Sequence, residues 1–153
     1  MRVVSVAIEH YRSQMNSIAS KLPEYEVVMG MTGIGISLGP QLMAEIGDIK
    51  RFSHKGALTA YAGVDPGVNQ SGMYNQISTR TTKRGSAELR RTLYMVAEVL
   101  LKTKTKDDPV YMFLSKKRAE GKPYFVYMTA TANKFLRVYY GKVNEYLDSI
   151  EER

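Results

Sequence analysis

Hydrophobic residues recur every three or four positions along most of the chain, which is the spacing of one apolar face on an α-helix. In the first segment this face consists of Val4, Ile8, Tyr11, Met15, Ile18 and Leu22. The pattern predicts a helix from near residue 1 to about Lys21, and Pro23 then ends or interrupts it. No N-cap signal precedes this helix, so we expect the chain to be a fragment of a longer protein.

Five further segments have the same periodicity, and no segment has the alternation of a β-strand. The predicted helices are residues 41–46, a helix capped by Ser53 and running to about Tyr61, a helix capped by Ser86, a helix opened by Asp108-Pro109 and ended by Gly121, and a last helix from about Pro123 to Ser149. In the helix after Ser86, the shared face is Leu89, Leu93, Val96 and Leu100. In the last helix, the inward residues are Phe125, Met128, Ala132, Phe135, Val138 and Tyr139. The sequence therefore predicts an all-α, compact helical bundle with long terminal helices and an irregular central loop.

Four glycines within residues 30–39 indicate a tight turn, and Pro40 suits the first turn of the helix that follows. The run Gly33-Ile34-Gly35 resembles the hairpin of a helix-hairpin-helix motif, here covering about residues 25–48. Glycines allow close approach to a phosphate, and the next helix N-terminus offers free N–H groups to an anion. We predict that Gly33, Ile34 and Gly35 bind a nucleic-acid backbone, with Ile34 and Ile36 anchored in the core. The alternative is a plain turn between two helices of a bundle.

Residues 63–85 lack helical periodicity and are rich in Gly, Pro, Asn, Ser and Thr, which is typical of a functional or disordered loop. Within it, Ser71 precedes a glycine, so its hydroxyl is a candidate nucleophile once a base or a metal activates it. A basic group that could hold phosphates follows, made up of Arg80, Lys83, Arg84, Arg90 and Arg91. The alternatives are a turn serine that bonds its own backbone and a solvated basic surface.

Composition agrees with a nucleic-acid partner and excludes several other classes. The chain has 22 Lys and Arg against 15 Asp and Glu, a formal charge of +7, which suits a polyanion, although a basic soluble protein is the alternative. With no cysteine and two histidines, thiolate chemistry and cysteine zinc sites are excluded. No apolar run approaches the roughly 18 residues of a membrane span, and no signal peptide is present, so we expect a cytoplasmic protein without a membrane partner.

Six sequence blocks together resemble one family. They are residues 33–35, 44–52, 58–66, 70–72, 82–86 and 89–93, which read GIG, AEIGDIKRF, LTAYAGVDP, QSG, TKRGS and LRRTL. In this order they resemble the C-terminal domain of the DEDD-type insertion-sequence transposases, the insertion sequence one-hundred-ten group.

The resemblance implies a recombinase whose serine attacks DNA and forms a phosphoserine intermediate, and that serine maps to Ser71. Residues 1–22 would be the end of a connecting, coiled-coil-like helix, and residues 23–153 the C-terminal transposase domain. A preceding RNase H-like domain would carry four acidic residues and Mg²⁺, while no metal site or other cofactor is expected in this fragment. DNA, a structured guide RNA and further copies of the chain are the implied partners. The isolated fragment is expected to be inactive.

Two other functions are compatible with the same residues. The chain could be a non-catalytic helix-hairpin-helix module that binds nucleic acid, or an oligomerisation module that pairs through the apolar face of its first helix.

Overall fold

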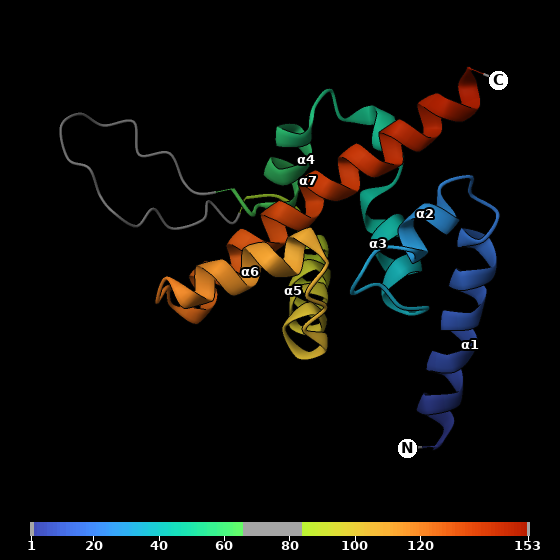
Figure 1. The fold of residues 1–153 in the computed structure, drawn as a ribbon. Coiled ribbons are helices and arrows are strands. Elements are labelled where there is room, and N and C mark those ends of the chain that lie inside the picture. The colour runs from blue at the N-terminus through green and yellow to red at the C-terminus, as the bar shows by residue number, and fades with distance from the viewer. Residues whose placement is uncertain (1, 66–83, 153) are drawn as a thin grey trace.

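The computed structural model describes residues 2–65 and 84–152, and within these residues it contains seven α-helices, one 3₁₀ helix and no strand. The helices are α1 (Arg2–Ala19), α2 (Tyr25–Met29), α3 (Leu38–Ile46), the 3₁₀ helix η1 (Ile49–Arg51), α4 (Lys55–Ala62), α5 (Ala87–Thr103), α6 (Pro109–Ala119) and α7 (Tyr124–Glu151). Figure 1 shows α7 crossing the molecule, with α4, α5 and α6 against it and α1 at one side. The predicted all-α, compact fold is confirmed.

Side-chain caps explain where three of these helices begin. The Ser86 hydroxyl accepts a hydrogen bond from Leu89 N at 3.1 Å, which confirms the predicted cap of α5. One Asp108 carboxylate oxygen accepts from two backbone N–H groups at the start of α6, at 3.0 and 2.8 Å. At α4 the predicted cap, Ser53, is wrong by one residue. His54 is the cap, because its Nδ1 accepts from Ala57 N at 3.2 Å and satisfies a free N–H of the first turn.

The core lies between α7 and the helices that pack on it. The four predicted face residues of α5 are all buried, and so are Met128, Ala132, Phe135 and Tyr139 of α7. Burial also raises the pKa of the Tyr139 hydroxyl. The inward prediction for Phe125 is wrong, since this side chain is 74% exposed. Phe125 lies in the first turn of α7, next to the α6–α7 turn at the end of the bundle away from α1 (Figure 1).

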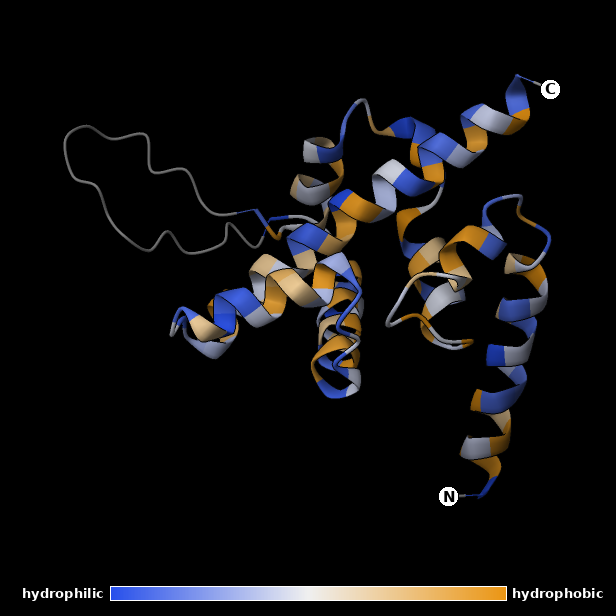
Figure 2. Cartoon of the chain, in the orientation of Figure 1, coloured by the Kyte–Doolittle hydropathy of each residue, from blue (hydrophilic) through white to orange (hydrophobic). Residues whose placement is uncertain are grey.

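The α1 helix forms as predicted, but its apolar face has no cover in the described chain. Its single buried residue is Ala19, and all six residues of the predicted face are exposed. Figure 2 shows these hydrophobic positions along a helix that extends away from the bundle. The end of α1 is tied to the rest of the molecule by a hydrogen bond from the Tyr25 hydroxyl to the Asn16 side chain, 2.7 Å long.

The glycine turn between α2 and α3 packs partly against the core, through Gly33 and Ile34. Gly33 has φ +87°, and a Cβ there would lie 3.1 Å from Leu100 and 3.4 Å from Val96 of α5. Ile34 packs against the core as predicted. The prediction for Ile36 is wrong, because this side chain is 68% exposed. The turn therefore uses one isoleucine as its anchor, and the helix-hairpin-helix interpretation stays a prediction.

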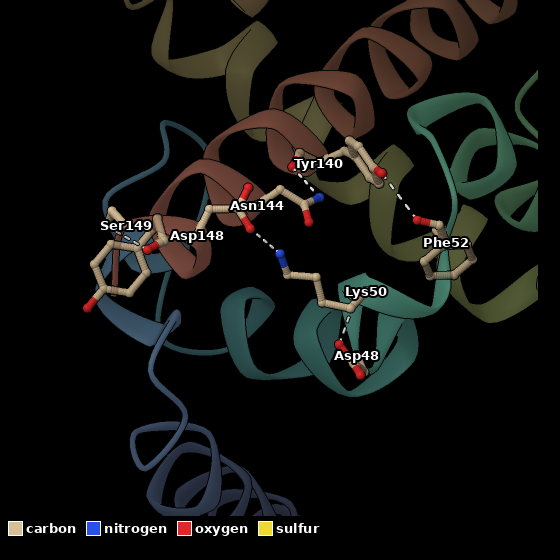
Figure 3. Close-up of polar contacts among 8 residues, drawn as sticks. Asp48, Lys50, Phe52, Tyr140, Asn144, Asp148 and Ser149 are labelled. Atoms are coloured by element: carbon tan, nitrogen blue, oxygen red, sulfur yellow. Dashed lines mark hydrogen bonds and ion pairs between the residues drawn. The ribbon is translucent and has the colours of Figure 1, made fainter. Parts of the chain in front are cut away.

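The connection from α3 to α4 is fixed by polar contacts with α7 (Figure 3). The Tyr140 hydroxyl donates to Phe52 O at 3.1 Å, and Lys50 pairs with Asp148. The hydrogen bond from Lys50 to Asp148 raises the pKa of the Lys50 ammonium. These contacts hold the segment before α4 on the side of α7, and so set the position of α4 itself.

Arg51, which belongs to one of the recognised sequence blocks, has a structural role here. Its guanidinium donates two hydrogen bonds to Ile46 O, at 3.1 and 2.8 Å, and so satisfies a carbonyl at the C-terminus of α3. It also lies over the rings of Phe52 and Tyr61, 4.4 and 4.6 Å from their centroids. The residue therefore links the C-terminus of α3 to Phe52 and to Tyr61 of α4.

Within the described residues, none of the helices combines the length and the apolar character needed to cross a membrane.

Candidate nucleic-acid interface

The structure places the predicted site residues in three groups. Ser71, Arg80 and Lys83 lie outside the described residues. Arg84, Arg90 and Arg91 lie before α5 and in its first turns, and Gly33 to Gly35 form the turn between α2 and α3. The described candidate site is therefore the surface around residues 61–65 and 84–91.

The two ends of the chain that flank residues 66–83 are held side by side. Ser86 N donates to Tyr61 O at 2.7 Å, which joins the start of α5 to the end of α4. Gly63 and Gly85 have φ +67° and +110°, values that L side chains rarely adopt. A Cβ at Gly63 would collide with Arg84 O, and one at Gly85 would collide with Tyr61 O. The two backbones come so close that only glycine fits at either position, which explains both glycines in the sequence blocks.

A third element, α7, holds the end of the segment that leaves α4. The side-chain amide of Asn133 donates to the Asp65 carboxylate at 2.8 Å and to Val64 O at 3.4 Å. The carbonyl oxygen of the same amide accepts from Arg137 Nε at 2.8 Å. Asn133 thus joins a carboxylate to a guanidinium and ties Asp65 to the bundle. Sequence reasoning missed both α7 residues, because the contact spans 68 positions and their only local signal is a polar pair four residues apart.

The three described arginines of the predicted basic group differ in what they can do. Arg84 and Arg91 are exposed. Arg90 is half-buried, and its guanidinium donates to Ala62 O at 3.4 Å, at the C-terminal end of α4. Arg84 and Arg91 are therefore the residues with the freest access to a phosphate, while Arg90 also supports the base of the segment.

The position of these three arginines makes the surface around them more attractive to anions. They lie at the N-terminus of α5, a 17-residue helix whose first N–H groups carry a partial positive charge. Arg137 of α7 is also exposed and belongs to the same neighbourhood through Asn133. The nearby acids are Glu88, in the first turn of α5, and Asp65, which Asn133 already binds. Guanidinium groups around a helix N-terminus are suited to a phosphodiester backbone.

The structure does not bring the glycine turn and the arginines together. Gly33 lies against Val96 and Leu100, in the C-terminal half of α5, whereas the arginines lie at the other end. At about 1.5 Å per residue, the two regions are separated by roughly 10 Å along α5. Gly35 is exposed with open space around it, while Gly33 is used for packing. The two predicted binding regions therefore lie near opposite ends of α5, and they do not form one site.

A metal site was not expected in these residues. In residues 2–65 and 84–152, no three His, Asp or Glu side chains gather as metal ligands. Asp65, one of the two acids of the candidate surface, accepts a hydrogen bond from Asn133.

Comparison with known proteins identifies the family. The model of the "Transposase IS116/IS110/IS902 family" matches residues 25–111, more than half of the chain, from α2 into α6. The chain is 28% identical over 109 residues to the "Transposase for insertion sequence element IS1111A" of Coxiella burnetii. It is 27% identical over 122 residues to the "Insertion element IS900 uncharacterized 42 kDa protein" of Mycobacterium paratuberculosis. These alignments cover 71% and 79% of this chain but about 30% of the length of each relative. The matched region contains the glycine turn, the closely packed glycines 63 and 85 and the arginines of α5, and on this evidence the chain belongs to the IS116/IS110/IS902 family of transposases.

Proposed function

We propose that this chain is the strand-transfer domain of an insertion-sequence transposase, in which Ser71 attacks a phosphodiester of DNA. The observation that carries the proposal is the base of residues 66–83. Gly63, Gly85 and Asn133 fix both flanks of that segment beside Arg84 and Arg91. Family membership supports the reaction class, since the matching family is one of transposases.

The proposed chemistry is an in-line transesterification. The Ser71 oxygen forms a bond to phosphorus and gives up its proton to a base. The bond from phosphorus to one deoxyribose oxygen breaks, and that oxygen takes up a proton. The energy of the broken bond is kept in the phosphoserine and is used when a second DNA end displaces the serine. Arg84 and Arg91 would hold the flanking phosphates and offset charge that develops on the phosphoryl oxygens.

Two further parts of the proposal concern the longer parent protein. An RNase H-like domain of the parent would hold Mg²⁺, which stabilises negative charge on phosphoryl oxygens. A structured RNA would direct the choice of DNA. The resemblance of the six sequence blocks supports both, and no step assigned to this chain's own residues passes through the metal.

The test of the nucleophile is Ser71→Ala in the full-length parent, with Ser78→Ala as a matched control in the same segment. We expect Ser71→Ala to abolish recombination and the covalent protein–DNA adduct on a denaturing gel, while DNA binding stays nearly intact. Ser78→Ala should keep both activities. Normal recombination by Ser71→Ala would remove the proposal.

The phosphate contacts have a separate test. Binding of this chain to generic duplex DNA should weaken steeply with salt, and each lost phosphate contact should lower the slope of log K against log salt by about 1. We therefore expect a smaller slope for Arg84→Gln and for Arg91→Gln. Lys55→Gln, an exposed lysine at the start of α4, is the control. A flat salt response of the unmodified chain would argue against any nucleic-acid function.

A second function, pairing with another copy through α1, is favoured by one observation. The apolar face of α1 repeats at helical spacing over 18 residues and lies exposed. A helix with such a face is stabilised mainly by packing against a partner. Light scattering tests this: we expect a dimer or larger assembly that Ile8→Asp dissociates, and a strict monomer at high concentration would contradict it.

A further inference from the structure

The surface where α6 ends and α7 begins, residues 116–125, combines positive charge with exposed aromatic rings, and we call it the α6–α7 turn. Its cations are Lys116, Lys117, Arg118 and Lys122, and its acid is Glu120. Lys117 pairs with Glu120 at 3.0 Å, which leaves three exposed cations in the turn. The hydrogen bond from Lys117 lowers the pKa of Glu120, and the charges of Lys116 and Lys122 lower it further. The turn is therefore a positive surface even with its acid ionised.

Two aromatic side chains follow the last lysine. Phe125 is 74% exposed and Tyr124 42% exposed. The two rings meet edge to face, with centroids 5.3 Å apart and planes at 82°. Tyr124 is itself fixed by a similar contact with Tyr127, at 5.5 Å and 76°. The contact places Phe125 beside a ring that is already held by the bundle, while most of its own surface meets solvent. Burial in the fold does not account for this phenylalanine.

We infer that the α6–α7 turn binds an unpaired nucleic-acid strand, with a base stacked on Phe125 and phosphates held by Lys116, Arg118 and Lys122. Exposed rings next to cations are the arrangement that suits single strands, because every base offers a π-face and every nucleotide a phosphate. A duplex keeps its base faces stacked on each other and cannot use the ring in this way. The cations also favour a polyanion over an apolar protein partner, which would have to cover three charged side chains.

The turn is separate from the surface around Arg84, but α7 connects the two, because its Asn133 contacts Asp65 of that surface. Phe125, Thr129 and Asn133 follow one another at steps of four and so share one side of α7. The middle of this row is joined to α5 by the hydrogen bond between Thr129 and Tyr94. At about 1.5 Å per residue, Phe125 lies roughly 12 Å along the axis from Asn133.

The exposed side chains of the turn divide the proposed contact. Phosphates are assigned to the exposed cations Lys116, Arg118 and Lys122, and Phe125, which is more exposed than Tyr124, is assigned the base. Burial, together with the charge of Glu98, raises the pKa of Tyr124. Nothing in this contact requires Ser71.

Fluorescence anisotropy tests the inference. It measures the binding of the 153-residue chain to three labelled probes, which are a single-stranded DNA, the same sequence as RNA, and the duplex. We expect Phe125→Leu, which keeps an apolar side chain but removes the π-face, to weaken single-strand binding at least about five-fold. Duplex binding should change less than about two-fold, since it depends on phosphates. Phe125→Tyr should restore single-strand binding. Tyr146→Leu, which removes a partly buried ring near the other end of α7, is the matched control and should change neither.

The outcomes separate this inference from the proposed function. A loss with DNA, with RNA or with both supports the site and identifies which strand it takes. Unchanged binding of both single strands by Phe125→Leu, or an equal loss of duplex binding, overturns it. Because Phe125 is mostly exposed, the variant should fold, and an unchanged circular dichroism spectrum checks this. Ser71→Ala should leave single-strand binding unchanged, so either idea can fail alone.

Discussion

The helices α1 and α5 have nearly the same length and the same hydrophobic spacing, but they reach opposite outcomes. α1 has 18 residues and one buried side chain, whereas α5 has 17 residues and six. α5 is packed between α3, α6 and α7, while α1 contacts mainly α3. Periodicity thus predicts that a segment forms a helix and which side is apolar. Whether that side is covered depends on segments far away in the sequence.

The largest expected difference between the two helices is in the cost of truncating their apolar faces. Leu93→Ala in α5 removes a fully buried side chain and should lower the free energy of unfolding by about 2–5 kcal/mol. Ile8→Ala in α1 removes a side chain that is 45% exposed and should change it by less than about 0.5 kcal/mol. Urea denaturation at low protein concentration measures both. A loss above about 2 kcal/mol for Ile8→Ala would show that the face of α1 is covered, and the comparison would break.

The second prediction concerns how tightly the bundle holds the flanks of residues 66–83. Gly85→Ala places a Cβ against Tyr61 O at φ +110° and should cost on the order of 2–3 kcal/mol. Gly121 also has a positive φ, +74°, but has nothing within contact distance of its Cβ. Gly121→Ala should therefore cost only about 1 kcal/mol, from the backbone alone. Equal losses in thermal unfolding would mean that the close approach at Gly85 does not constrain the fold.

Local features of the fold could be predicted from the sequence, whereas features that depend on distant segments could not. The existence of the helices follows from local patterns, and so do caps such as Ser86 and Asp108, because the cap and its partner are three residues apart or fewer. The shift from Ser53 to His54 is a one-residue error of the same local kind. Phe125 and Ile36 were misplaced for a different reason. The sequence pattern predicts which way a side chain points from its own helix or turn. It does not show whether a neighbouring element extends far enough to cover that side chain.

The candidate site divides in the same way. The composition of residues 63–85 already shows the basic residues and the glycines. In the structure Arg84, just before α5, and Arg91, near the start of α5, are both exposed. The contact of Asn133 with Asp65 is set by the path of the whole chain, and the local sequence shows only that Asn133 and Arg137 form a polar pair four residues apart. The same holds for Gly33, whose glycine pattern predicted a phosphate contact but whose Cβ position faces Leu100. Ser71 lies outside the described residues and stays a prediction.

A third prediction concerns the tether between α1 and the bundle. Tyr25→Phe removes the hydroxyl that donates to Asn16 and should lower the stability of the last turns of α1 by about 1 kcal/mol. Amide hydrogen exchange should then speed up about five-fold in α1 and stay unchanged in α5. Tyr146→Phe, a partly buried tyrosine of α7, serves as the control. Faster exchange in both helices would indicate that α1 supports the bundle, in contrast to its exposed face.

The smallest effect is expected from two ion pairs of the same spacing, one at the end of α6 and one on α1. Lys117 and Glu120 pair at 3.0 Å at the end of α6, with side chains 31% and 35% exposed, and Arg12 and Glu9 pair at 3.4 Å on α1, 55% and 75% exposed. The Lys117 hydrogen bond lowers the pKa of Glu120 below its ordinary value of 4.5. A depressed carboxyl pKa stabilises the folded state fully above 4.5, and this contribution is lost as the pH falls through the lower folded value.

Glu120→Gln should therefore be slightly less stable than the unmodified chain at neutral pH and equal to it in acid. Glu9→Gln, which removes a more exposed pair, should differ from the unmodified chain less at neutral pH. Chemical denaturation across this range, with an NMR titration of the Glu120 carboxyl, measures both, and a carboxyl that titrates at or above its ordinary value would show that the cations of the α6–α7 turn do not act on it.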